Sequence, residues 1–96
     1  DEPNIRWDSA IALAKMGEES SVPIIENLMD REYLMTFPEL DYKEINKVIM
    51  TAIETSSIVL DNRFEPRLVE LARTDESLTV RDAAIKTLKK SYDRII

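Results

Sequence analysis

The chain of 96 residues has the size of one small domain, and its single glycine among many alanine, leucine, isoleucine, glutamate and lysine residues favours an all-helical fold. The absence of cysteine excludes disulfides and thiolate metal sites, and the absence of histidine removes the commonest metal ligand and general base. The net charge of −6 argues against nucleic acid as the main partner, because an acidic chain repels phosphate backbones.

Residues 4–35 are predicted to form a first helical hairpin. A first helix from Asn4 to Met16 is indicated by residues that recur at helical spacing, namely Ile5, Ser9, Ala12, Leu13 and Met16. Gly17 follows where a helix end needs a residue with positive φ. Ser20 and Ser21 are placed to cap a second helix, with Pro23 in its first turn, where the missing N–H costs nothing.

A second hairpin is predicted over residues 41–74. Its first helix opens at Asp41, which resembles a capping box together with Glu44. The expected buried side of this helix holds Ile45, Val48, Ile49, Ala52 and Ile53. The next helix restarts after Asp61 and Asn62 with Pro66 in its first turn, and its inward residues are Leu68, Val69, Leu71 and Ala72.

Residues 79–96 are predicted to begin a third hairpin. Thr79 is placed to cap a fifth helix, whose expected core residues are Val80, Ala84, Ile85 and Leu88. The segment from Ser91 to Ile96 is expected to begin a sixth helix that is cut short.

The sequence of the first helix returns twice. Ile5-Arg6 reappears 75 residues later as Val80-Arg81, and a weaker copy, Ile45-Asn46, lies 40 residues after the first. The apolar residues that follow each pair also correspond: Ala10, Ala12 and Leu13; Ala52 and Ile53; Ala83, Ala84 and Leu88. Spacing of about 35–40 residues is typical of stacked two-helix units.

The segment from Asp75-Glu76 through Val80-Arg81-Asp82-Ala83-Ala84 to Leu88 resembles the start of a HEAT repeat, of the variety named after phycobilisome lyases. The first hairpin, from Ile5-Arg6 through Gly17 to Asp30, is similar to one nearly complete repeat. The resemblance implies an all-α, short right-handed α-solenoid of about two and a half hairpins in a single domain over residues 1–96. Because the chain begins with Asp and not Met, we expect a piece of a longer protein with adjoining repeats.

The link after the first hairpin is the main departure from this pattern. Pro23 to Asn46 is 23 residues, whereas Pro66 to Arg81 is 15, and the additional residues fall between Arg31 and Tyr42. Three of the six aromatic residues lie here, and the segment's candidate binding residues are Tyr33, Met35, Phe37 and Tyr42. An insertion in a solenoid often projects from its binding face. Alternatively, the second helix extends to Met35 and the remainder folds over the core.

The resemblance also implies that the second helices line the concave side of the solenoid. Their polar residues are candidates for contact with a partner protein: Glu26, Asn27, Asp30, Arg67, Glu70 and Arg73. A merely solvated helix face is the alternative.

Three further residues have two interpretations each. Arg6 and Arg81 either recognise a partner's carboxylate or bridge neighbouring repeats. Trp7, the single tryptophan, either anchors an interface or packs against a preceding repeat.

We therefore expect a non-catalytic scaffold that binds another protein, uses no cofactor or nucleic acid, and makes no membrane contact within these residues. Ser56 and Ser57 have no base arranged to activate a hydroxyl, and one glycine cannot form a phosphate-binding loop. The family name suggests an alternative, a bilin-lyase-type or lyase-accessory protein for chromophore attachment.

Overall fold

The structure, a computed structural model, describes residues 3–95 of the chain and the side chains of residues 7–95. Within this range all regular structure is helical, so the predicted all-α class is confirmed. The α-helices are α1 (Pro3–Lys15), α2 (Val22–Leu28), α3 (Arg31–Leu34), α4 (Tyr42–Val59), α5 (Glu65–Thr74) and α6 (Leu78–Ser91). Short 3-10 turns, η1 (Glu19–Ser21) and η2 (Asn62–Phe64), precede α2 and α5.

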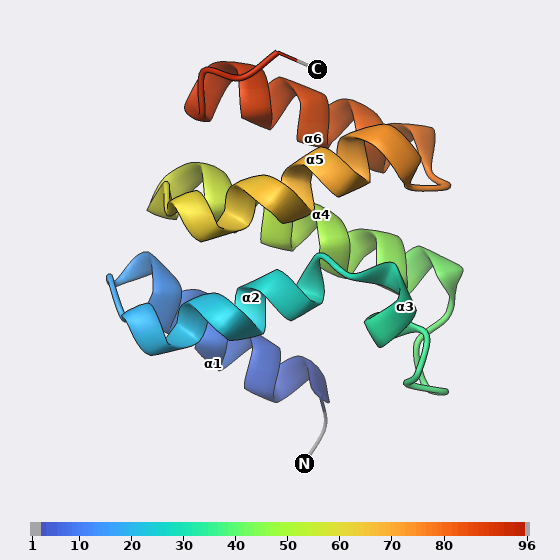
Figure 1. Cartoon of the computed structure of the whole chain (residues 1–96). Coiled ribbons are helices and arrows are strands. Elements are labelled where there is room, and N and C mark those ends of the chain that lie inside the picture. The colour runs from blue at the N-terminus through green and yellow to red at the C-terminus, as the bar shows by residue number, and fades with distance from the viewer. Residues whose placement is uncertain (1–2, 96) are drawn as a thin grey trace.

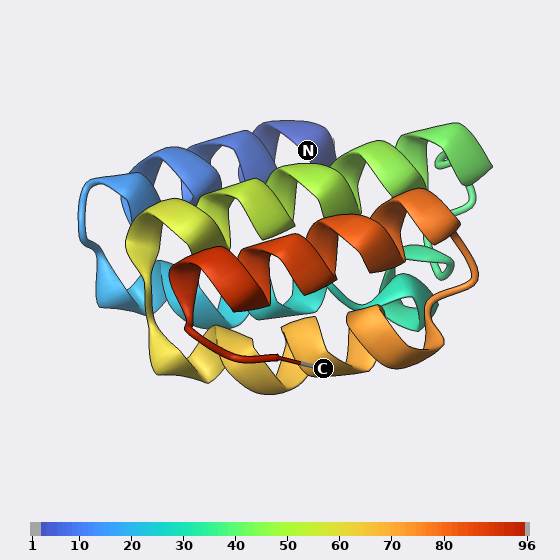
Figure 2. The ribbon, with the colours of Figure 1, turned by 90° about the horizontal axis from the view of Figure 1, so that it is seen from above.

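The helices lie in two layers (Figures 1 and 2). In the first layer α1, α4 and α6 lie side by side, and the second layer holds α2 and α5. Helix α4 contacts α1, α2 and α6, while α5 packs along α6. The Cα atoms extend over 38 × 30 × 15 Å, which is the flat shape expected of two helical layers. One hydrophobic core runs between the layers, from Trp7 in α1 to Leu88 in α6.

Several helix ends follow the local chemistry that predicted them. Gly17 has a φ of +91°, and the N–H groups of Gly17 and Glu18 donate to the carbonyls of Ala14 and Leu13 in a Schellman motif. The side chain of Asp41 accepts from the N–H of Glu44, and that of Glu44 accepts from the N–H of Asp41, which completes the predicted capping box.

The predicted caps of α2 and α6 are wrong. Ser21 has helical backbone angles and lies at the end of η1, so its hydroxyl makes no capping hydrogen bond. Helix α6 is capped by Ser77 in place of Thr79, and the Ser77 hydroxyl accepts from the N–H of Val80 at 3.3 Å. Ser77 has the extended backbone that an N-cap needs, whereas Thr79 is already inside the helix.

The residues that indicated α1 by their helical spacing do not form its buried side. Leu13 and Met16 are exposed together with Ser9 and Ala12, and the side chain of Ile5 lies outside the described residues. The buried residues of α1 are instead Trp7, Ala10 and Ala14. Burying the large Trp7 ring is the physical reason, because this one side chain outweighs a stripe that contains Ser and Ala.

The chain after α6 does not start another helix. Residues 92–95 are irregular, and the N–H of Arg94 donates to the carbonyl of Leu88. The Tyr92 hydroxyl donates to the carbonyl of Ser56 at 2.7 Å, and the Arg94 guanidinium pairs with Glu65 at 3.0 Å. These contacts turn the segment back towards α4 and α5, and the predicted start of a sixth helix at Ser91 is wrong. Ile96 lies outside the described residues.

Candidate functional site

The segment between α2 and α4 both packs on the core and exposes part of itself. Helix α2 ends at Leu28 and does not extend to Met35, because Asp30 begins a new helix by accepting hydrogen bonds from the N–H groups of Glu32 and Tyr33. Leu34 and Leu40 are buried, which anchors the segment to the core. Met35 and Tyr42 are 63% and 53% exposed. The buried residues fit the interpretation that the segment folds over the core, and the exposed residues fit the interpretation that it binds a partner.

An aromatic cluster forms the inner side of this segment. The Phe37 ring meets the rings of Trp7 and Tyr33 edge to face, with centroids 5.3 Å apart in both pairs. Trp7 is 5% exposed, so it packs within the chain itself. Of the four candidate residues here, Tyr33 and Phe37 thus support the fold, while Met35 and Tyr42 face outward.

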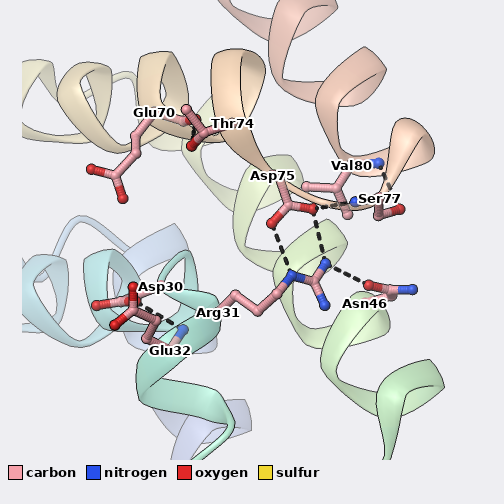
Figure 3. A network of polar contacts seen from close by, with 9 residues as sticks. All are labelled: Asp30, Arg31, Glu32, Asn46, Glu70, Thr74, Asp75, Ser77 and Val80. Carbon is pink, nitrogen blue, oxygen red and sulfur yellow. Dashed lines mark hydrogen bonds and ion pairs between the residues drawn. The ribbon is translucent and has the colours of Figure 1, made fainter.

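Arg31 joins three parts of the fold at the start of α3 (Figure 3). Its Nε and Nη2 atoms donate to the two carboxylate oxygens of Asp75 at 2.9 Å, and Nη2 also donates to the Asn46 Oδ1 at 2.6 Å. The side chains of Arg31 and Asp75 are only 10% and 2% exposed. Asp75 in turn accepts from the N–H of Ser77 at 3.0 Å, which ties the group to the start of α6. We call Arg31, Asn46, Asp75 and Ser77 the Arg31 clasp.

Within the clasp, the negative charge of Asp75 neutralises the positive charge of Arg31. The hydrogen bonds that Arg31 donates to the Asp75 carboxylate raise the pKa of Arg31. Burial acts in the opposite direction, and the negative charge of Asp75 adds to the increase. The Arg31 guanidinium also lies 5.4 Å from the centre of the Tyr42 ring. Because Asp75 balances the charge of Arg31, nearby carboxylates determine the sign of the surface around it.

Two adjoining hollows border the clasp, with volumes of about 220 and 260 Å³. They share Arg31, Met35 and Glu76, and together we call them the Met35 groove. Towards α5 its wall includes Asp30, Glu32 and Glu70. Towards α4 the wall includes Phe37, Pro38, Leu40 and Tyr42. The groove therefore has an apolar side and an acidic side.

The groove brings together residues from both predicted binding surfaces. Asp30 and Glu70 come from the second-helix set, and Met35, Phe37 and Tyr42 come from the segment before α4. Arg67 lies beside it, with its Nη1 3.5 Å from an Asp30 oxygen and 3.9 Å from a Glu70 oxygen. Half-buried Glu26 and exposed Arg73 do not line the groove, and neither does Tyr33.

Of the two repeated arginines, only Arg81 has a side chain within the described residues. The side chain of Arg6 lies outside the described residues. Arg81 forms no ion pair with the side chains described for residues 7–95, and its Nε is enclosed without a hydrogen-bond partner. The expected bridge from Arg81 to a neighbouring repeat is therefore absent from that range.

Sequence reasoning missed the Arg31 clasp and Glu76 as parts of the site. Arg31 meets partners 15 and 44 positions away, and no local pattern specifies such pairs. One signal was present, because Asp75-Glu76 precedes the third copy of the repeated motif.

Within the described residues, no group of three or more acidic side chains is arranged to hold a metal ion, and no helix is long and apolar enough to cross a bilayer. Comparison of the chain with protein-family models, curated proteins and solved structures finds no match.

Proposed function

We propose that the protein is a short right-handed α-solenoid of HEAT-like hairpins that serves as a non-catalytic protein-interaction module. Its binding surface is the second-helix face together with the segment between α2 and α4, and the two meet at the Met35 groove. The layering of α1, α4 and α6 over α2 and α5, and the repeated sequence of the first-layer helices, support the solenoid. The function is supported most by one observation: an exposed Met35 lies between carboxylates and apolar side chains in the same groove.

The partner is a protein segment that carries an apolar side chain beside basic ones. Met35 and the apolar wall near Phe37 and Leu40 offer contact for an aliphatic side chain. The exposed carboxylates of Glu32, Glu70 and Glu76 attract cations, since Arg31 is already balanced by Asp75. Electrostatic attraction of this kind selects the partner more than it adds affinity.

The test uses a short fluorescein-labelled peptide in which one leucine lies between pairs of lysines. Its fluorescence anisotropy should rise with protein concentration, and the rise should weaken at high salt because the surface charges are screened. Peptides with glutamate for lysine, or serine for leucine, should bind more weakly.

Charge reversal identifies the surface. The double variant Glu70→Lys/Glu76→Lys should weaken binding about tenfold, which corresponds to ~1.4 kcal/mol. The single variant Glu70→Lys has Glu54→Lys as its matched control, since both reverse one charge. Glu54 is exposed on α4 and does not line the groove, so Glu54→Lys should leave binding unchanged. Equal binding of the lysine and glutamate peptides, or equal losses from Glu54→Lys and Glu70→Lys, would contradict the proposed surface.

A further inference from the structure

Arg31 retains one hydrogen-bonding nitrogen that the clasp does not use. Its Nε and Nη2 atoms donate to Asp75 and Asn46, whereas Nη1 forms no hydrogen bond with the residues described for positions 7–95. Figure 3 shows this nitrogen on the side of the guanidinium that is turned away from Asp75. Because each terminal guanidinium nitrogen carries two N–H groups, Nη1 still offers two donors.

This nitrogen opens into the Met35 groove. Among the described side chains that are buried or half-buried, the Nε of Arg81 is the only enclosed nitrogen or oxygen without a hydrogen-bond partner. The Nη1 of Arg31 also lacks a partner but is not enclosed, so solvent reaches it. Since Arg31 lines both hollows of the groove, the groove is where Nη1 meets the solvent.

The charges around Nη1 favour a neutral acceptor over an anion. Asp75 balances the charge of Arg31, and Glu76, which lines both hollows, also acts electrostatically to raise the pKa of Arg31. Glu32 and Glu70 add two exposed carboxylates to the hollow towards α5. An incoming carboxylate or phosphate would therefore meet net negative charge, whereas a carbonyl oxygen accepts a hydrogen bond without adding charge.

The two hollows that share Arg31 suit the side chains of an extended segment. In an extended chain, adjacent side chains point to opposite sides of the backbone. An apolar side chain can then enter the hollow towards α4, beside Phe37 and Leu40, while the basic side chain of the adjacent residue enters the hollow towards α5. The backbone between these two residues passes Arg31, so its carbonyl group lies within reach of Nη1.

We propose that Nη1 of Arg31 donates a hydrogen bond to a backbone carbonyl of the partner protein, between an apolar and a basic residue that are adjacent in an extended segment. This inference rests on the proposed function, because it assigns how the same groove holds its partner. The backbone contact fixes the position of the segment, and the two hollows select its side chains. The clasp holds the guanidinium in place before the partner arrives, which lowers the cost of ordering it on binding.

Sulfur substitution along the fluorescein-labelled peptide tests the hydrogen bond. A thioamide replaces one carbonyl oxygen at a time by sulfur, which is a weaker acceptor. The thioamide on one side of the leucine should weaken binding about fivefold, whereas thioamides at the ends of the peptide should change it by less than about twofold. Equal binding by all the thioamide peptides would overturn this inference and leave the proposed function intact. If the unmodified peptide does not bind, both are wrong.

The spacing of the two side chains provides a second test. Peptides that carry one leucine and one lysine among serines should bind several-fold more tightly when the two are adjacent than when one serine separates them. The separated pair would place both side chains on the same side of an extended backbone. Tighter binding of the separated pair would contradict the extended segment.

A third measurement separates a carbonyl from an anion as the acceptor. In nitrogen-edited NMR spectra recorded in the cold, the Nη1 hydrogens of Arg31 should shift to higher frequency when the peptide is added. The guanidinium hydrogens of Arg63, which pairs with Asp61 at 2.8 Å outside the groove, are the matched control and should not shift. Inorganic phosphate should leave the Arg31 signals in place at equal ionic strength. A shift of these signals with phosphate would identify an anion site and overturn the inference.

Discussion

Tyr92 connects the end of the described chain to the turn between α4 and α5. Its hydroxyl donates to the carbonyl of Ser56 at 2.7 Å and lies 3.3 Å from that of Asp61. Leu60, between these two acceptors, has a φ of 55° and completes the turn. Burial raises the pKa of Tyr92 to about 12, although the hydrogen bond to Ser56 acts in the opposite direction.

This pKa predicts a loss of stability in alkali. The unfolded chain has a tyrosine pKa of about 10, so the folded state holds the proton more tightly. The stabilisation is fully present below pH ~10 and is lost as the pH rises through about 12. Urea unfolding between about pH 9 and about pH 12 should show a steeper loss for the unmodified chain than for Tyr92→Phe.

The same variant has a second expected effect at neutral pH. Tyr92→Phe removes the hydroxyl donor and leaves the carbonyls of Ser56 and Asp61 without it, which should cost about 1 kcal/mol of unfolding free energy. If the unmodified chain and Tyr92→Phe lose stability equally as the pH rises, the hydroxyl of another residue, or the lysines, cause the alkaline loss.

At the residue scale, the sequence predicted the contacts that are made within a few positions. The Asp41–Glu44 capping box and the positive φ of Gly17 are decided by neighbouring backbone groups, and both predictions are confirmed. The Arg31 clasp was not predictable, since the distance between Arg31 and Asp75 is 44 residues along the chain. Of the candidate site, Met35 and Tyr42 were identified from the sequence as candidate binding residues, but their position beside Arg31 depends on that clasp.

The elements depend on their end residues in ways that single substitutions can measure. At α6, Ser77→Ala removes the acceptor for the N–H of Val80 and should lower the free energy of unfolding by about 1 kcal/mol. Thr79→Ala should have an effect of less than about 0.5 kcal/mol, because Thr79 is exposed inside the first turn. Thermal or urea unfolding of the two variants compares the observed cap with the one expected from the sequence. A larger loss from Thr79→Ala would contradict the observed cap.

Substitutions at the C-terminal ends of α1 and α4 should change the stability of the protein in opposite directions. Gly17 has a φ of +91° and open space where a Cβ atom would lie, so Gly17→Ala should cost about 1 kcal/mol through backbone conformation alone. Leu60 adopts a φ of 55° at the C-cap of α4 and is 53% exposed, so Leu60→Gly should stabilise the protein by up to ~1 kcal/mol. Urea midpoints should move in opposite directions, and a destabilised Leu60→Gly would show that the leucine side chain contributes more than its backbone costs.

At the element scale, the sequence located the helices better than their faces. The predicted first helix, Asn4 to Met16, corresponds to α1, Pro3–Lys15, yet its buried residues, Trp7, Ala10 and Ala14, are not among those that indicated the helix by their spacing. Helix α1 carries apolar residues on both sides, so its periodicity does not decide between them, and the contact of Trp7 with Phe37 does. In α4 most of the apolar residues lie on one side, although Ile58 is exposed, and the buried Ile45, Ile49 and Ile53 were predicted correctly.

The whole molecule is held together across its layers by the Arg31 clasp as well as by the core. The clasp joins α3 to α4 and to the link between α5 and α6, so it connects segments up to 44 positions apart in the chain. Figure 3 shows this link between the segment after α2 and the start of α6. Stacked helical units without such links tend to unfold from their ends, because each unit contacts only its neighbours.

Breaking the clasp should therefore lower both stability and cooperativity. Arg31→Gln leaves the carboxylate of Asp75, which is 2% exposed, without its cation, and the expected loss is about 3 kcal/mol. Arg63→Gln is the matched control, since Arg63 is 46% exposed in its ion pairs and should change the free energy of unfolding much less than Arg31→Gln does. The double variant Arg31→Gln/Asp75→Asn should recover part of the loss, because it removes the unpaired charge and retains an acceptor for the N–H of Ser77.

Two probes of unfolding test the effect on cooperativity. Emission from Trp7, the single tryptophan, reports on α1 and Phe37, whereas far-ultraviolet circular dichroism reports on all the helices. In the unmodified chain the two urea transitions should coincide, as for a two-state domain of this size. In Arg31→Gln the Trp7 transition should move to lower urea than the helical one, because α3 no longer ties the first hairpin to the start of α6. Coincident transitions in that variant would mean that the apolar core alone couples the layers, and the clasp would then contribute stability without cooperativity.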